Sequence, residues 1–400
     1  MDARALAPPP LPVVKLPPAL ETLIRERASR RRDPDSMRSL FTEDAVTLST
    51  RFPTWETGID RSVWAVGWFP PFQPYVLRPA QYRMRGQVAQ IMGYYMDAAS
   101  PNEILGFFDI DAELGRDGQW RISSEAGSFP QLRKSEPLSA DDLIKLLDEA
   151  GIRRAVILSN AYFFDGLVPI PGDDYANVRA ENDWTAEQVA KYPDRLVAFC
   201  SFNPTREHAS RELDRCAKSG AFKGVKLHLG TSPVDLDNPV HVAKTRKIFE
   251  QSNRLGLPLL LHLTASPEWG KRQAEIFLNQ LVTAAPDVQV VVAHLWGGAW
   301  YNDEVLSFFA DAVSNGRPGT KNLYFEVSQA ALITRGKPAM LQAIATHMRR
   351  IGLNRMYYGS DTPLPPGESP KKIWEDFRKN VPLTDAEFRI LANNVAPWAH

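Results

Sequence analysis

The second part of the chain, residues 137–400, is predicted to fold as a (β/α)8 barrel, an α/β fold in which helices surround parallel strands. Seven short apolar segments recur there, each followed by a helical pattern. Their apolar residues run almost continuously, as in parallel strands buried on both faces. Polar residues recur at intervals of 34, 32, 34 and 33 residues, at His228, His262, His294, Ser328 and Asp361. One strand, one helix and two loops take about that length.

The predicted strands and helices of this part have clear boundaries. Ser139 is placed to cap a helix that ends at Gly151, and Asn238 and Pro239 begin another that ends at Gly256. The predicted strands span residues 154–160, 195–203, 224–230, 257–264, 288–296, 322–329 and 355–362. A closed barrel needs one strand more than these segments supply.

The first part, residues 19–130, is predicted to be a separate α+β unit. Residues 20–41 are largely helical and rich in arginine, with a break at Asp33-Pro34. Alternating segments follow at 82–96, 105–114 and 119–126, and the Asp-Gly pair between the last two favours a hairpin. Helices followed by an antiparallel sheet form a unit distinct from the barrel.

The composition excludes several classes of partner. The chain has 47 basic and 47 acidic side chains, so it has no overall field that attracts nucleic acid or an anionic membrane. Its apolar runs are shorter than the roughly 18–20 residues that span a bilayer. Cys200 and Cys216 are too few for a disulfide scaffold. Because no apolar export signal follows Met1, we expect a cytoplasmic protein with a small-molecule substrate; a homo-oligomer remains open.

Four motifs of the second part resemble the amidohydrolase-related metal-dependent hydrolases, over roughly residues 137–398. They are Gly224-Val-Lys-Leu-His228, Pro258-Leu-Leu-Leu-His262, Val291-Val-Ala-His294 and Tyr358-Gly-Ser-Asp361-Thr-Pro363. The first part resembles the cone-shaped ketosteroid-isomerase-like domains, which include the nuclear-transport-factor-like and SnoaL-like domains. That second resemblance is carried by residues 33–46, by Gly58 and by the strands ending at Trp120-Arg-Ile.

The resemblance to amidohydrolases also implies where the eighth strand lies. Strand one of that family carries Asp-x-His-x-His, and the corresponding residues here are Asp2-Ala3-Arg4-Ala5-Leu6. Residues 1–7 are therefore expected to form a degenerate strand one, followed by the inserted cone domain and by strands two to eight. Both metal-binding histidines of the motif are replaced, by Arg4 and Leu6.

The same resemblance implies roles for the polar residues at the strand ends. A divalent metal, zinc in the first place, would be held by His262, Asp361 and His228, with Asp361 also the general base. His294 would help to hold the metal or polarise the substrate. Because zinc usually takes three or four protein ligands, the loss of the strand-one pair counts against metal binding. The expected substrate-binding residues are Arg4, Lys226 and Trp296.

Several side chains allow two interpretations. Glu326 faces either the barrel interior or the helices, since a continuous apolar pattern does not separate the two faces. Trp269, Trp296 and Tyr301 follow strands five and six, where loops line substrate pockets, but loop aromatics also serve as packing residues. Tyr162 after strand two has the same two interpretations.

Three functions are compatible with these residues. The leading expectation is a hydrolase of a lactone, ester or amide, in which Asp361 activates water with or without a metal. The alternatives are a non-oxidative decarboxylase of an aromatic or unsaturated acid, and a catalytically inactive binding protein. The intact strand-end cluster favours an enzyme, whereas the missing strand-one histidines favour the inactive protein.

Overall fold

The computed structural model describes residues 14–30, 33–49, 52–67, 75–98, 104–128, 139–165, 173–263, 269–298, 301–334, 336–362 and 369–399. The chain divides into two compact units, residues 1–136 and 137–400. The expected strand one, residues 1–7, lies outside the described residues. No helix within the described ranges is both long and apolar enough to cross a membrane.

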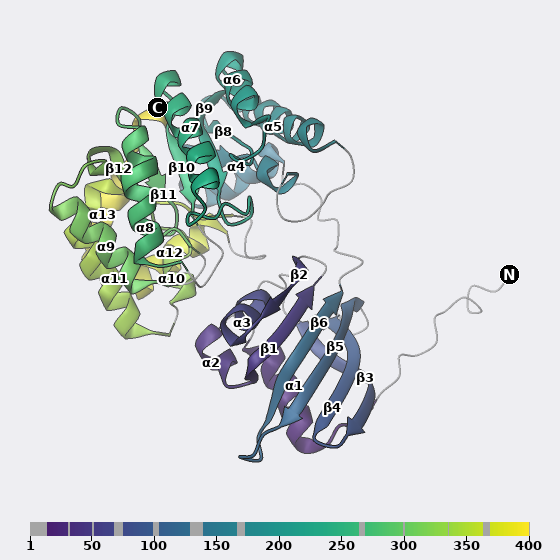
Figure 1. Ribbon diagram of the computed structural model, residues 1–400. Helices are drawn as coiled ribbons and strands as arrows, with labels where there is room; N and C mark the ends of the chain where they lie inside the picture. The colour runs from purple at the N-terminus through teal and green to yellow at the C-terminus, as the bar shows by residue number, and fades with distance from the viewer. Residues whose placement is uncertain are drawn as a thin grey trace. The chain divides into compact units, whose positions relative to one another are not determined.

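The first unit contains a six-stranded sheet in the order β2-β1-β6-β5-β4-β3 (Figure 1). Neighbouring strands are antiparallel except for β1 and β6, which run parallel. The strands are β1 (Phe41–Ser49), β2 (Phe52–Thr57), β3 (Tyr75–Arg85), β4 (Val88–Asp97), β5 (Ile104–Leu114) and β6 (Trp120–Ser128); the helices are α1 (Pro18–Ser29), α2 (Pro34–Arg38) and α3 (Ile59–Gly67).

This unit corrects two sequence expectations. The helical region predicted up to Phe41 ends earlier, because Asp33 caps the short helix α2 and Phe41 already begins β1. The alternating run 82–96 is a hairpin and not one strand. Gly86 has a φ of +64° in its turn, a conformation that glycine adopts without strain. The predicted hairpin between β5 and β6 is confirmed.

A buried ion pair joins helix α1 to the sheet. Leu20, Leu23 and Ile24 share the buried face of α1 with Arg27, whose side chain is fully enclosed. The Arg27 guanidinium donates to both oxygens of Glu125 on β6 and to the hydroxyl of Tyr75, 3.2 Å away. Glu125 also accepts a hydrogen bond from the hydroxyl of Tyr95 at 2.8 Å, so both of its oxygens are hydrogen-bonded.

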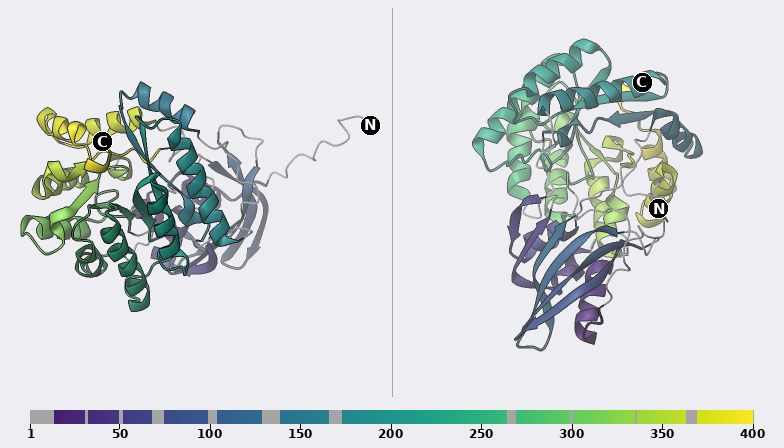
Figure 2. Two further views of the ribbon diagram at one scale, coloured as in Figure 1. Left: turned by 90° about the horizontal axis from the view of Figure 1, so that it is seen from above. Right: turned by 90° about the vertical axis from the view of Figure 1, so that its right-hand side faces the viewer.

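The second unit contains a seven-stranded parallel sheet in the order β13-β12-β11-β10-β9-β8-β7. All seven predicted strands are confirmed. They are β7 (Ala155–Leu158), β8 (Leu196–Ser201), β9 (Phe222–His228), β10 (Leu259–His262), β11 (Val290–Val292), β12 (Leu323–Glu326) and β13 (Met356–Tyr357). The helices lie around the outside of these strands (Figures 1 and 2).

The helices of this unit begin and end at recognisable caps. Ser139 caps α4 as predicted, and α7 begins after Asn238 and ends at the left-handed Gly256. The helices are α4 (Ala140–Glu149), α5 (Asp174–Ala190), α6 (Ala209–Ser219), α7 (Pro239–Leu255), α8 (Lys271–Ile276), α9 (Asp303–Ser314), α10 (Ala330–Ile333), α11 (Pro338–Ile351), α12 (Pro370–Asn380) and α13 (Asp385–Asn393).

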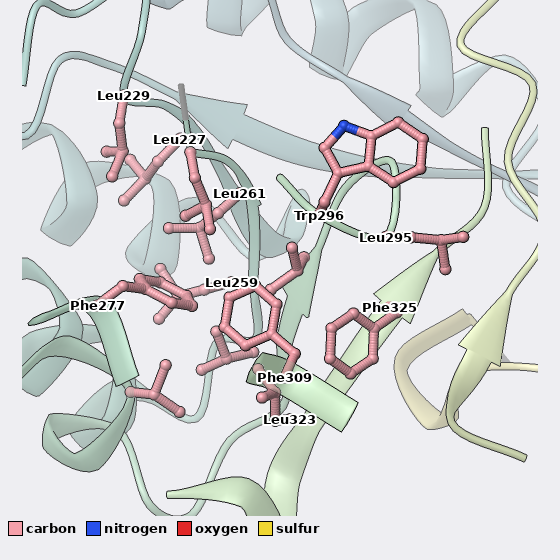
Figure 3. Close-up of a cluster of buried hydrophobic side chains, with 14 of the residues drawn as sticks. Leu227, Leu229, Leu259, Leu261, Phe277, Leu295, Trp296, Phe309, Leu323 and Phe325 are labelled. Atoms are coloured by element: carbon pink, nitrogen blue, oxygen red, sulfur yellow. The ribbon is translucent and has the colours of Figure 1, made fainter. Parts of the chain in front are cut away.

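The two faces of the parallel sheet are buried in different ways. Outward-facing residues such as Leu227, Leu259 and Phe325 pack against Phe277 and Phe309 of the surrounding segments (Figure 3). The opposite face forms a smaller apolar cluster drawn from most of the strands and from the C-terminal segment: Val197, Phe199, Leu260, Val291, Ala293, Tyr357 and Ala396. Because residues from so many strands meet on this face, the sheet is curled, and the cluster is its interior.

The buried ion pair of the first unit gives a stability prediction. Arg27→Met leaves the Glu125 carboxylate buried without its cation, so the free energy of unfolding should fall by about 3–5 kcal/mol. Arg38→Met is the matched control, because Arg38 forms an exposed pair with Asp60, and it should cost less than about 1 kcal/mol. Urea unfolding of the full chain measures both values. Equal losses for the two variants would show that the buried pair contributes no more than an exposed one.

Candidate active site

Strand alternation and register bring four polar side chains to the interior of the curled sheet. Leu260 faces the interior and pairs in register with Lys226, while His262 pairs with His228 two residues further on. Successive side chains of a strand point to opposite faces, so residues two apart share one face. Tyr324 packs against the interior cluster, which places Glu326, two residues later, on the same face. The open question about Glu326 is thereby decided in favour of the interior.

His294 reaches the interior by a different route. In strict alternation it would share the outer face with Val290 and Val292, which belong to the outer cluster. Its backbone, however, is left-handed, with a φ of +55°, and Leu295 follows with +63°. This conformation ends the strand and allows the imidazole to contact side chains of the neighbouring strands β10 and β12.

The three histidines expected from the sequence are in contact with one another. The rings of His228 and His262 stack at 3.9 Å between centroids, with an angle of 13° between their planes. Nε2 of His294 lies 3.1 Å from Nδ1 of His262. Nδ1 of His228 accepts a hydrogen bond from the backbone N–H of Thr231 at 3.0 Å, which fixes this ring nitrogen as an acceptor.

A buried hydrogen-bond chain continues from His294 to Glu326. Nδ1 of His294 lies 2.9 Å from the hydroxyl oxygen of Ser328, and this hydroxyl lies 2.7 Å from Oε2 of Glu326. The backbone N–H of Ser328 donates to the other oxygen of the same carboxylate. Burial raises the pKa of Glu326, whereas His294 and the bonds from Ser328 lower it. Gly359 makes room for this carboxylate, because a Cβ there would lie 2.2 Å from Oε1.

Asp361 is held at the rim by Gln329, whose side-chain amide donates to Oδ2 at 3.0 Å. Both residues have left-handed backbones, with φ values of +53° for Asp361 and +63° for Gln329. Among the described non-glycine residues, positive φ occurs only at these two and at His294 and Leu295. Such a conformation costs about 1–2 kcal/mol per residue. Backbone strain is therefore concentrated at the ends of β11, β12 and β13, as is typical of functional sites.

Lys226 brings a buried positive charge to the same interior. Its ammonium group has no hydrogen-bond or ion-pair partner among the described residues, although the residue is only 6% exposed. Burial lowers the pKa of Lys226 to about 8, while the negative charges of Asp361 and Glu326 act in the opposite direction. Lys226 is therefore mostly protonated at neutral pH. A buried cation without a direct partner is costly, which makes it a candidate for binding an anion.

Further residues that the sequence singled out are Trp296, Tyr162, Arg4 and Pro363. Trp296 is fully buried in the outer apolar cluster, edge-on to Tyr301 at 5.2 Å between ring centroids. Tyr162 packs its ring against His228 at 4.9 Å, and so lies beside the site. Arg4 and Pro363 fall outside the described residues. Ser328 and Gln329 were not predicted as site residues.

The described side chains do not form a set that fits a divalent metal. Nε2 of His294 and Nδ1 of His262 lie 3.1 Å apart, within hydrogen-bonding distance of one another. One nitrogen of His228 is already bonded to the backbone. Among the described residues, no group of three or more His, Cys, Asp or Glu side chains is arranged to hold a metal ion. The site therefore has two cationic or proton-bearing elements of its own, Lys226 and the histidine group.

Comparison with known proteins finds decarboxylases among the relatives of this chain. The chain is 29% identical over 182 residues to the gamma-resorcylate decarboxylase of Polaromonas sp., covering 43% of this chain and 49% of that protein. It is also 29% identical over 126 residues to the gamma-resorcylate decarboxylase of Rhizobium sp., covering 30% of this chain and 38% of the relative. The chain thus spans half or less of the length of these two curated relatives.

A solved structure of dihydroxybenzoic acid decarboxylase from Polaromonas sp., with bound manganese and the inhibitor 2-nitroresorcinol, is also similar. Its sequence is 20% identical, the match covers 62% of this chain and 81% of that one, and the TM-score is 0.41. The manganese and the inhibitor belong to that protein.

The expectation that the chain is a hydrolase is wrong. The curated relatives are named as decarboxylases, so the alternative drawn from the sequence, a decarboxylase, fits them better. The broader expectation of an amidohydrolase-type chain is confirmed by a family model described as "Amidohydrolase", which matches residues 170–394. These residues make up more than half of the chain and contain Lys226, the three histidines, Glu326 and Asp361. The chain therefore belongs to the amidohydrolase family.

Proposed function

We propose that this protein is a non-oxidative decarboxylase of an aromatic carboxylic acid that carries a hydroxyl group beside the carboxylate. The similarity to gamma-resorcylate decarboxylases carries the proposal. A hydroxybenzoate would offer this site an anionic group, a phenolic hydroxyl and a flat apolar ring. The side chains of the interior match these three features with a cation, a carboxylate and aromatic rings.

Lys226 is proposed to bind the substrate carboxylate. Its ammonium group is buried and has no direct partner among the described residues. A carboxylate placed beside it would form a charge-assisted hydrogen bond in a region of low dielectric, where such bonds are strong. The expected substrate-binding role of Lys226 is retained in this form.

The reaction requires that a proton replace carbon dioxide on the ring. The proton adds to the ring carbon that bears the carboxylate; the electron pair of the bond to the carboxyl carbon then returns to the ring as carbon dioxide leaves. We assign the proton to the paired His262 and His294, because an imidazolium is an effective acid near neutral pH. One proton is consumed in each turnover and is restored from solvent.

Asp361 is proposed to accept the proton of the phenolic hydroxyl. The resulting phenolate increases electron density at the neighbouring ring carbon and so makes that carbon easier to protonate. Gln329 holds one Asp361 oxygen at 3.0 Å, which leaves the other available for the substrate. These steps use only the described side chains of Asp361, His262 and His294.

We also propose that the curled sheet belongs to a (β/α)8 barrel and that residues 19–130 form a ketosteroid-isomerase-like domain. Seven parallel strands around one interior cluster support the first assignment. A six-stranded, mainly antiparallel sheet packed against helix α1 supports the second.

Asp361→Asn tests the proposed function directly. Release of carbon dioxide from a panel of mono- and dihydroxybenzoates should be measurable with the unmodified protein, and the variant should lower kcat by roughly 100-fold or more, since it keeps the shape but loses the base. Asp194→Asn, at an exposed position, is the control and should have full activity. No carbon dioxide release from any hydroxybenzoate would overturn the proposal.

Lys226→Met tests the assignment of the carboxylate-binding group. Loss of a buried charge-assisted bond should raise KM by roughly 10- to 100-fold, with a smaller effect on kcat. Lys223→Met is the matched control, because Lys223 lies on the same strand but is exposed; its KM should not change. Steady-state kinetics at constant ionic strength separates the two variants, and an unchanged KM for Lys226→Met would place the carboxylate elsewhere.

Removal of divalent metals tests whether the side chains are sufficient. Treatment with a chelator should leave the decarboxylation rate unchanged, and elemental analysis of protein purified without chelator should find well below one transition metal ion per chain. Activity that disappears on chelation and returns with manganese or zinc would contradict this expectation.

A further inference from the structure

The hydrogen-bond chain behind His294 contains a serine and a glutamate that the proposed reaction does not use. Ser328 is 2% exposed and Glu326 is 9% exposed, so neither side chain can exchange its partners for bulk water. The chain runs from Glu326 through the Ser328 hydroxyl to Nδ1 of His294, and from Nε2 of His294 to His262. Each neighbouring pair of atoms in it lies between 2.7 and 3.1 Å apart.

The positions of the hydrogens decide which group donates and which accepts at each step of this hydrogen-bond chain. The backbone N–H groups of Ser328 and His294 both point to Glu326, at Oε1 and Oε2, so its carboxylate is an acceptor for fixed donors. The Ser328 hydroxyl has a single hydrogen, which it donates to the carboxylate at 2.7 Å. The hydroxyl oxygen then accepts from Nδ1–H of His294, at 2.9 Å, and the backbone carbonyl oxygen of Ser328, 3.2 Å from the same nitrogen, can also only accept from it.

We infer that Glu326 and Ser328 are positioning residues that hold His294 in the Nδ1–H tautomer and direct its Nε2 lone pair to His262. Fixing the tautomer in this way also fixes the orientation of the His294 imidazole toward His262. The oriented pair of histidines can then pass a proton to a bound ring. This last step rests on the proposed decarboxylation, whereas the tautomer does not.

The tautomer can be measured without any assay of activity. In protein labelled with 15N only in histidine, the chemical shift of a ring nitrogen depends on whether that nitrogen is protonated. The variant His294→Asn identifies the signals that belong to His294. The unmodified protein at a pH where His294 is neutral should show protonated Nδ1. Protonated Nε2 in the neutral ring would overturn the inference at once.

Two variants test the direction of the chain. Ser328→Ala removes the nearer of two acceptors for Nδ1–H and leaves the backbone carbonyl oxygen of residue 328, which lies 3.2 Å away. Glu326→Gln, of nearly the same shape, can donate its amide hydrogens to the serine oxygen and so release the hydroxyl to donate to Nδ1. Glu326→Gln should shift His294 toward the Nε2–H tautomer, and Ser328→Ala should do so to a smaller extent, because the backbone carbonyl oxygen still accepts from Nδ1–H. Ser252→Ala, which removes a buried hydroxyl without a hydrogen-bond partner on α7, should leave the His294 signals unchanged.

The kinetic consequence provides a second readout. Ser328→Ala and Glu326→Gln should each lower kcat for decarboxylation by roughly 10- to 100-fold while KM stays within about twofold, as expected for residues that orient a catalytic group. An unchanged His294 tautomer in folded Glu326→Gln would overturn the inference, even if the protein is an active decarboxylase. A tautomer change in a protein that releases no carbon dioxide would instead overturn only the proposed function.

Discussion

Burial of both faces of the parallel sheet is the constraint on which the site depends. Outward side chains such as Leu261 and Phe325 pack against the helices, and inward ones such as Leu260 and Val291 pack against each other. A polar group on either face must therefore find a partner or remain costly. The polar residues at the ends of β9, β10 and β12 meet this requirement mainly through one another, which is why they form a connected cluster and not isolated positions.

The strained backbone at the strand ends gives a second indication of function. Left-handed residues at His294 and Gln329 free their side chains from strand alternation, and each then bonds to a residue from an adjacent strand. Gly359 adds a close approach that no other residue would permit, since any Cβ would overlap the Glu326 carboxylate. The left-handed backbone lowers stability at the ends of β11, β12 and β13. At each of these ends, the resulting conformation places a polar side chain in the site.

The sequence was sufficient to predict the parallel strands, several helix caps and the three histidines, because apolar runs and cap residues act locally. The sequence did not predict which face of its strand carries Glu326, since a strand that is apolar on both faces has no pattern that distinguishes the two faces. Ser328 and Gln329 were not predicted as site residues, because their roles arise from strand register and from left-handed turns. In the first unit, the turn at Gly86 was missed within an alternating run, although a glycine in such a run is itself a signal.

The two units each bury a cation, and the difference between these cations explains why one is structural and the other a candidate for binding. Arg27 is surrounded by a carboxylate and a tyrosine hydroxyl, so its charge is compensated within the fold. Lys226 is nearly as buried, but the carboxylates that influence its pKa do not lie within bonding distance of its ammonium group in the described structure. Burial of the Lys226 charge therefore lowers the free energy of unfolding, and no ion pair in the described structure offsets this loss. A carboxylate-bearing substrate would complete around Lys226 the pairing that Glu125 provides for Arg27, so the energy of forming this pair would become available for binding.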